Sequence, residues 1–266
     1  MIFLIGGGGF VGSSFARVLG RSGRDFAIIE KDNYPDFVGK ACDVIINANG
    51  NSRKPLAATA PLEEFQLSVT TVRASLADFA CKLYVHLSTC DVYPDCSSPE
   101  VTAERQVIDV SRQSPYGFHK YLAEQCVRHA APDWLIIRMG GLVGPGLKKN
   151  AIFDILHGGP LWLDAESELQ FMHSETLAEL VLALVDRQVR SEVYNVCGQG
   201  VVRLREVIEW AGTGVAVTPG SPKVRYEVNI EKLSRLVAVP PTRETVRAFV
   251  RAESPRALAE TSPIRP

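Results

Sequence analysis

Short apolar runs alternate with longer amphipathic segments in the first half of the chain. The longer segments have the apolar spacing of helices. Strands that are apolar along their whole length and alternate with helices are typical of a parallel sheet covered on both faces. We therefore expect an α/β fold with a doubly wound parallel sheet. The expected strands are Met1–Ile5, Phe26–Ile29, Asp43–Ala48, Leu83–Leu87 and Trp134–Arg138, and the expected helices are Phe10–Leu19, Leu67–Cys81 and Pro115–Ala131.

The pattern becomes less regular in the second half, where Gly144-Pro145-Gly146 and Gly158-Gly159-Pro160 interrupt it. We interpret residues 1–145 as the sheet domain and residues 146–252 as a smaller lobe that is interleaved with the end of the sheet. Residues 253–266 form a tail with little apolar surface to bury. The elements expected in the second half are helices at Thr176–Val189, Leu204–Ala211 and Arg243–Arg251 and a strand at Glu192–Val196.

Composition and charge exclude several classes of protein. The 266 residues are 46% hydrophobic and 22% charged, which is typical of a globular, soluble chain with a large core. The net charge of −1 gives no attraction to nucleic acid or to an anionic membrane. No apolar run could span a bilayer and no leader precedes the first strand, so we expect a cytoplasmic protein. The six cysteines and five histidines lack ligand spacings, so we expect reduced thiols and no metal site.

The first strand runs directly into a glycine-rich turn. Gly6, Gly9 and Gly12 recur at every third position, and a helix begins within the repeat. Such glycines let the backbone approach a pyrophosphate, whose charge the helix N-terminus stabilises. Glu30 ends the next strand, where a carboxylate can hold the ribose hydroxyls of NAD, and Lys31 could meet the 2′-phosphate of NADP. We therefore predict a Rossmann-like dinucleotide-binding domain that takes NAD, with NADP left open.

Tyr116 and Lys120 lie four residues apart in the third expected helix, so their side chains share one face. A phenol holds its proton up to about pH 10, and a neighbouring ammonium lowers that pKa. The pair can therefore exchange a proton with an alcohol, whereas removal of a hydride requires a cofactor. The spacing by itself also occurs by chance on surface helices.

Together with Ser88-Thr89, these features resemble the extended short-chain dehydrogenase/reductase family. More narrowly, the chain is similar to the NAD-dependent epimerase/dehydratase branch, which acts on nucleotide-linked sugars. The resemblance covers residues 1–250. Further segments that match the family's motifs, in the family's order, are Ile45–Gly50, Leu87–Tyr93, Arg138–Gly146, Phe171–His173 and Tyr194–Val196.

The resemblance implies a role for each matching residue. Tyr116 would act as acid/base, Lys120 would lower its pKa and hold the nicotinamide ribose, and Thr89 would hydrogen-bond the reacting hydroxyl. It also implies a possible homodimer that pairs through the helices at Leu67–Cys81 and Pro115–Ala131. The residues that it implies for cofactor binding are Gly6, Gly9, Phe10, Val11, Gly12, Glu30, Asn47, Ala48, Tyr116, Lys120 and Arg138.

Several positions depart from the family's pattern. Cys90-Asp91 replaces the Asp-Glu pair of the sugar dehydratases, so we do not expect dehydration. Asp91 is either a second catalytic acid/base beside the new ketone or a residue that caps a loop or pairs with a basic side chain. Ser68 stands where the family has a helix asparagine. The short connection between Glu30 and Asp43 predicts an abbreviated adenine side of the cofactor site.

The substrate end of the site is less well defined. Leu169 stands where the family often has a diphosphate-binding arginine, and Lys148, Lys149 or Arg225 could replace it. We expect Lys148, Lys149 and Asn150 to face an anionic or hydroxyl-rich substrate at the mouth of a cleft.

The leading hypothesis is an NAD(P)-dependent sugar-nucleotide epimerase or 4-keto reductase that transfers hydride at a sugar carbinol carbon. Two alternatives remain at this point. One is a non-catalytic dinucleotide-binding protein that senses redox state. The other is an oxidoreductase of the same family that acts on a non-sugar alcohol.

Overall fold

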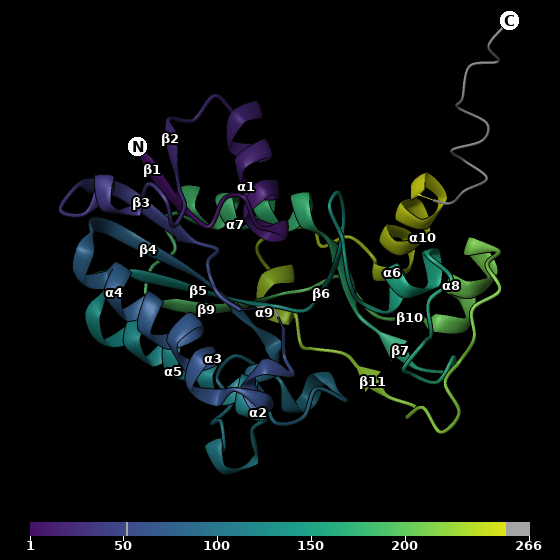
Figure 1. Ribbon diagram of the computed structural model, residues 1–266. Coiled ribbons are helices and arrows are strands. Elements are labelled where there is room, and N and C mark those ends of the chain that lie inside the picture. Colours follow the sequence, from purple (N-terminus) through teal and green to yellow (C-terminus); the bar gives the residue numbers. More distant parts are fainter. Residues whose placement is uncertain (52, 254–266) are drawn as a thin grey trace, which may run out of the picture.

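Six parallel strands form the central sheet, in the order β2-β1-β3-β4-β5-β9 (Figure 1). A computed structural model describes residues 1–51 and 53–253 of the chain. The six strands lie where the apolar runs predict them, and the α/β fold with a Rossmann-like parallel sheet is confirmed. Their bounds are β1 (Ile2–Ile5), β2 (Phe26–Ile29), β3 (Ala41–Asn47), β4 (Ala80–Thr89), β5 (Trp134–Met139) and β9 (Glu192–Val196).

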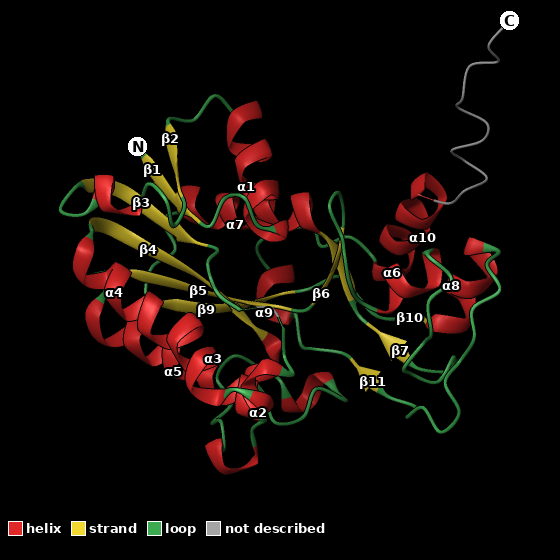
Figure 2. Cartoon of the chain, viewed as in Figure 1, coloured by secondary structure: helices red, strands yellow, loops and turns green. Residues whose placement is uncertain are grey.

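Helices cover both faces of this sheet, as Figure 2 shows. Helix α1 (Phe10–Arg21) packs beside α7 (Ser174–Asp186) on one face, and α4 (Thr71–Asp78) packs beside α5 (Pro115–Ala130) on the other. Tyr84 and Val85 are neighbours on β4, and both are fully buried, one under each helical layer. Burial on both faces explains why the strands are apolar without alternation.

The connection between β2 and β3 contains only the 3₁₀ turn η1 (Tyr34–Phe37). Strand β2 therefore forms one edge of the main sheet, with no further strand beside it among the described residues. This arrangement agrees with the short spacing between Glu30 and Asp43.

The helix before β4 begins and ends earlier than its periodicity predicts. It consists of α3 (Pro61–Phe65), a π-helical turn η2 (Gln66–Thr70) and α4. Pro61 occupies the first turn, where a missing N–H is harmless, and Phe79 is already extended. Cys81, which the pattern assigns to the helix, instead pairs with Cys42 of β3. The predicted range of 67–81 was therefore wrong at both ends, because strand pairing overrides the local apolar spacing.

The smaller lobe has its own core. Ile152, Ile155, Val207, Val246 and Val250 are fully buried there. Both α7 and β9 come from the second half of the chain and return to the main sheet. The lobe consists of β6 (Gly141–Val143), α6 (Ala151–Leu156), β7 (Glu168–Leu169), β8 (Phe171–His173), β10 (Val202–Arg203), α8 (Leu204–Ala211), β11 (Arg225–Tyr226) and α10 (Thr242–Glu253).

The remaining short elements connect the two parts; they are α2 (Leu56–Thr59), η3 (Cys90–Val92), η4 (Pro99–Val101), η5 (Val110–Arg112) and α9 (Glu231–Ser234). The division at residues 145 and 146 stays a prediction. Of the expected tail, Glu253 ends α10, and the rest lies outside the described residues. Among the helices of residues 1–51 and 53–253, none combines the length and apolar character that crossing a bilayer requires.

The turn between β1 and α1 depends on close backbone packing. Gly6 has a φ of +77°, a conformation that favours glycine. A Cβ atom at Gly12 would lie only 2.0 Å from the carbonyl oxygen of Gly6. The first turn of α1 therefore rests directly on the turn after β1, and a side chain would push the two apart.

We expect a Gly12→Ala variant to lose about 1–3 kcal/mol of unfolding free energy or more, because its methyl group meets backbone rather than a movable side chain. Gly20→Ala is the matched control, because Gly20 lies in the same helix and its Cβ would meet nothing within 4 Å. That control should gain roughly 0.5–1 kcal/mol from the higher helix propensity of alanine. Urea unfolding of the two variants measures both changes, and equal stabilities would contradict the packing argument.

Candidate active site

A cleft of about 990 Å³ opens at the carboxyl ends of the central strands and extends to the lobe. Ligands of open parallel sheets bind at this edge. The cleft collects most of the residues that the sequence singles out. Those that line it are Gly9, Phe10, Val11, Ala48, Thr89, Asp91, Tyr116, Lys120, Lys148, Lys149 and Asn150.

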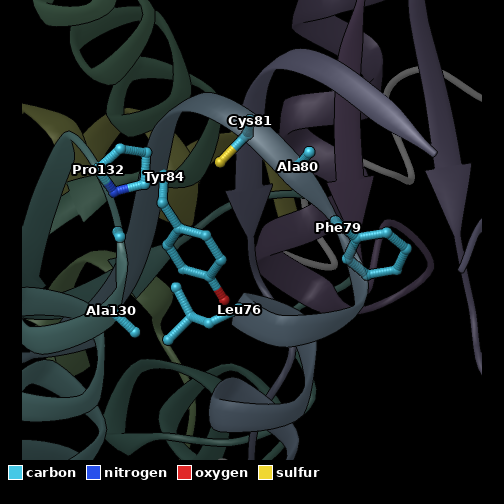
Figure 3. A pocket seen from close by; sticks show the side chains of 8 residues that line it. Leu76, Phe79, Ala80, Cys81, Tyr84, Ala130 and Pro132 are labelled. Atoms are coloured by element: carbon cyan, nitrogen blue, oxygen red, sulfur yellow. The ribbon is translucent and has the colours of Figure 1, made fainter. Parts of the chain in front are cut away.

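A smaller hollow of about 200 Å³ lies at the opposite end of β4 (Figure 3). Its lining includes Leu76, Cys81, Tyr84 and Pro132. Burial raises the pKa of the Cys81 thiol to about 12, so this group stays protonated. The Tyr84 hydroxyl is hydrogen-bonded to the Ser75 hydroxyl within the core. Because no acid/base set meets in this hollow, the larger cleft is the candidate active site.

The glycine turn forms the cofactor end of the cleft. Gly9 caps α1 without a side chain, and Gly8 and Gly9 line the cleft. The N-terminus of α1 can therefore meet a pyrophosphate directly. The carboxylate of Glu30 accepts a hydrogen bond from the Gly8 N–H, which places it against this turn. The glycine turn fits a dinucleotide, whereas Glu30 is not among the residues that line the cleft, and its contact with a ribose stays a prediction.

The side chain of Asn47 is turned into the core and does not line the cleft, and its expected contact with the cofactor stays a prediction. It is buried, and its amide donates a hydrogen bond to the Tyr84 hydroxyl over 2.6 Å. Its Oδ1 accepts a bond from the Asn49 N–H over 2.9 Å. Asn47 therefore shapes the turn after β3, and its neighbour Ala48 lines the cleft.

Arg138 is likewise held inside the core, and its expected contact with the cofactor stays a prediction. Its side chain is almost fully buried, and Nε and Nη2 donate to the Glu124 carboxylate over 3.0 and 2.7 Å. Nη1 donates to the Tyr93 hydroxyl over 2.9 Å. Arg138 is not among the residues that line the cleft, because its guanidinium is held in a buried ion pair below it.

Helix α5 brings Tyr116 and Lys120 to the strand ends. The Tyr116 hydroxyl donates to the Asn51 carbonyl over 3.2 Å, and Lys120 Nζ donates to the Leu87 carbonyl over 3.3 Å. The helix can approach this closely because position 117 is glycine. A Cβ there would lie 2.1 Å from the Asp91 carbonyl oxygen. Nothing in the sequence marks Gly117 for this role, although it lies within the Tyr116–Lys120 segment.

The acidities of this pair differ from the expectation. Burial lowers the pKa of Lys120 to about 8, against the opposing effects of Glu124 and Glu64. Burial and then the carboxylates of Asp91 and Glu64 raise the pKa of Tyr116. The predicted lowering of the Tyr116 pKa by Lys120 is therefore wrong for this arrangement. The reason is that the phenol and the ammonium bond to different carbonyl oxygens, so burial dominates.

Thr89, Asp91 and Lys54 form a polar chain along the cleft. The Thr89 hydroxyl accepts a bond from the Asp91 N–H over 3.1 Å and donates to the Asp91 carboxylate over 3.0 Å. Lys54 Nζ lies 2.8 Å from the same carboxylate. Asp91 thus takes part in a loop cap and in an ion pair while it also lines the cleft. Lys54 comes from a distant loop and belongs to no motif, so nothing in the sequence indicates its contact with Asp91.

A buried carboxylate lies behind the Tyr/Lys pair. Glu64 is fully buried on α3, where it accepts a hydrogen bond from Ser68 and contacts His119 Nδ1. Ser68 lies in the π-helical turn η2, at the position that resembles the family's helix asparagine. Sequence gives no sign of this cluster, because the Glu63-Glu64 pair is also typical of an exposed helix.

The lobe supplies the outer rim of the cleft. Asn150 caps α6 by accepting a bond from the Phe153 N–H over 3.0 Å, so its amide also has a structural task. Lys148 and Lys149 line the cleft beside it. Arg225 instead pairs with Glu168 and Glu227 and is absent from the lining.

Comparisons with known proteins agree with this geometry. Residues 2–197 match the family model described as the NAD dependent epimerase/dehydratase family. GDP-6-deoxy-D-mannose reductase from Pseudomonas aeruginosa is 23% identical in an alignment of 237 residues that covers 78% of each chain.

Among solved structures, RMD from Pseudomonas aeruginosa in complex with NADPH is 18% identical with a TM-score of 0.77, over 96% of this chain and 100% of that one. A UDP-galactose 4-epimerase is 18% identical with a TM-score of 0.77, over 97% of this chain and 98% of that one. At these identities the structural likenesses establish the fold. The family match spans most of the chain, so this protein belongs to the NAD-dependent epimerase/dehydratase family and is an NAD(P)-dependent enzyme of the extended short-chain dehydrogenase/reductase type.

Proposed function

We propose that the protein transfers hydride at a carbinol carbon of a nucleotide-linked sugar, as a 4-keto reductase or an epimerase, with Tyr116 as acid/base. The observation that carries this proposal is the meeting of Thr89, Tyr116 and Lys120 in one cleft with the glycine turn. A redox sensor would not need these three groups together. The basic rim also favours a charged sugar nucleotide over an apolar alcohol.

The protonated form of Tyr116 is the form that reduction of a ketone requires. Burial raises the pKa of Tyr116 further above neutral pH, so the phenol keeps its proton there and can donate it to a ketone oxygen. Thr89 can turn its hydroxyl proton from Asp91 to the same oxygen and fix its direction. Burial lowers the pKa of Lys120 to about 8, so its ammonium is still mostly charged at pH 7. The nicotinamide supplies or accepts the hydride when bound.

Epimerisation is the second candidate, and Asp91 is the observation that supports it. An epimerase of this kind needs a group that exchanges a proton at the carbon beside the ketone. Asp91 lines the cleft next to Thr89 and could serve. Incubation with a 4-keto sugar nucleotide in deuterated water tests for this proton exchange, because an enzyme that epimerises the carbon beside the ketone speeds the incorporation of deuterium there, whereas reduction alone does not.

We also propose a homodimer that pairs through α5, as the family resemblance implies, and through α3, which precedes the expected range Leu67–Cys81. Leu62, Phe65 and Phe118 expose 86%, 38% and 37% of their surface on α3 and α5. Phe65 and Phe118 both contact the His119 ring, so they form one patch. We expect Phe118→Glu to shift the mass measured by light scattering from dimer to monomer. A wild-type monomer at micromolar concentration would contradict the pairing.

We expect Tyr116→Phe to lower kcat by about 10²–10⁴-fold, because the proton donor is lost. NAD(P) affinity should change little, since the ring remains. The measurement is NAD(P)H absorbance with a panel of 4-keto nucleotide sugars. Tyr121→Phe is the matched control, because Tyr121 lies on the same helix but does not line the cleft. Equal rates for the wild type and Tyr116→Phe would overturn the role of Tyr116.

We expect Lys120→Met to be inactive yet more stable than the wild type at pH 7, by up to about 3 kcal/mol. Burial lowers the pKa of Lys120 from 10.5 to about 8 because the charged ammonium is less stable in the folded protein than in water. At pH 7 the folded protein therefore carries a charge that costs free energy, and methionine removes that cost. Above pH 8 the folded lysine loses its proton while the unfolded lysine keeps it up to about 10.5. The wild type should therefore gain stability relative to the variant as pH rises through this window.

Urea unfolding of both proteins between pH 7 and pH 10.5 measures this difference. Lys40→Met serves as the control, because Lys40 is exposed and its replacement should give a difference that does not change with pH. A Lys120→Met variant that is less stable at pH 7, with no trend, would show that the buried charge is compensated.

A further inference from the structure

Four basic side chains meet at the mouth of the cleft. Arg53 and Lys54 come from the loop between β3 and α2, and Lys148 and Lys149 come from the loop between β6 and α6. All four line the cleft and are exposed. We call this set the basic clamp, because its two halves belong to different parts of the fold.

The basic clamp concentrates positive charge in one place. Among the described residues that line the cleft, Asp91 is the one carboxylate. Burial and then the nearby charges of Arg53 and Lys54 lower the pKa of Lys149, as expected when like charges are brought together. Such a concentration costs free energy by itself and is relieved when an anion binds.

Contacts within the cleft also position the side chains of the basic clamp. Asp91 draws Lys54 Nζ to within 2.8 Å, so the ammonium is directed into the cleft. Arg53 adds a planar guanidinium that can bind two phosphate oxygens at once. Arg225, the other basic candidate of the lobe, is engaged by Glu168 and Glu227 and does not line the cleft.

We propose that the basic clamp binds the diphosphate of a nucleotide-linked substrate, with one half on each side of the cleft. The inference rests on the proposed function, and it adds Arg53 and Lys54 as the residues that determine the preference for a charged substrate. A cation pair on each rim matches a ligand with two linked phosphates. The basic clamp comes from other segments of the same cleft than the glycine turn, where Gly8 and Gly9 would meet the pyrophosphate of the cofactor.

Isothermal titration of NAD-saturated protein tests the clamp. The probes are inorganic pyrophosphate, UDP, GDP and inorganic phosphate, each at low and high salt. We expect pyrophosphate and the nucleoside diphosphates to bind while NAD stays bound, and to bind more weakly at high salt. The double variant Arg53→Gln/Lys54→Met should bind them at least roughly tenfold more weakly, because charge-assisted hydrogen bonds are lost.

Two matched controls remove the same charges elsewhere. Arg225→Gln removes a guanidinium of the lobe outside the cleft, and Lys40→Met removes an exposed ammonium outside the lining. Both should bind the probes as the wild type does. The clamp is overturned if Arg53→Gln/Lys54→Met behaves like these controls, or if pyrophosphate binds only by displacing NAD. Binding of phosphate as tight as that of pyrophosphate would also overturn the diphosphate assignment.

The outcomes separate this inference from the proposed function. If the protein binds UDP through the basic clamp but oxidises no NAD(P)H with any 4-keto nucleotide sugar, the result supports the basic clamp and contradicts the proposed reaction. If the protein reduces an uncharged ketone with NAD(P)H but does not bind pyrophosphate, the result supports hydride transfer and contradicts the basic clamp.

Discussion

The buried ion pair of Glu124 and Arg138 is the interaction on which the site depends. It joins α5 to β5, and Ser88 donates a further bond to Glu124 from β4 over 2.6 Å. A buried ion pair adds little net stability compared with apolar packing, but its geometry is directional. Its direction sets how α5 lies on the sheet. Tyr116 and Lys120 precede Glu124 on that helix by about two turns and one turn, and they reach the segment after β3 and the end of β4 as a consequence.

Burial governs the chemistry that follows from this placement. The same removal from water raises the pKa of a phenol and lowers the pKa of an ammonium. Tyr116 therefore keeps its phenol proton at neutral pH, and the pKa of Lys120 falls to about 8. Asp91 has a different environment, because Lys54 and Thr89 both contact its carboxylate. One cleft thus contains a protonated phenol and a paired carboxylate a short distance apart along β4 and α5.

Gly12 and Gly117 are under the same steric constraint, but only one of the two can be recognised from the sequence. Gly12 packs on the carbonyl oxygen of Gly6, and Gly117 packs on that of Asp91, each with no room for a Cβ atom. Gly12 belongs to a repeat with a regular spacing, so its role could be predicted. Gly117 contacts a segment that lies 26 residues away in the sequence, and no spacing within its own helix indicates that contact.

The sequence by itself determined the parallel sheet, the glycine turn, the Tyr116/Lys120 pair and the position of Thr89. These features follow from local periodicity and from motifs within one turn, and such patterns report which face of an element is apolar. Only the tertiary structure decided that Asn47 and Arg138 turn into the core, that Glu64 lies behind Tyr116 and Lys120 and that Lys54 meets Asp91. The physical reason is that each of these side chains has its partner on a distant segment, and the direction it takes is set by the packing that brings the two segments together.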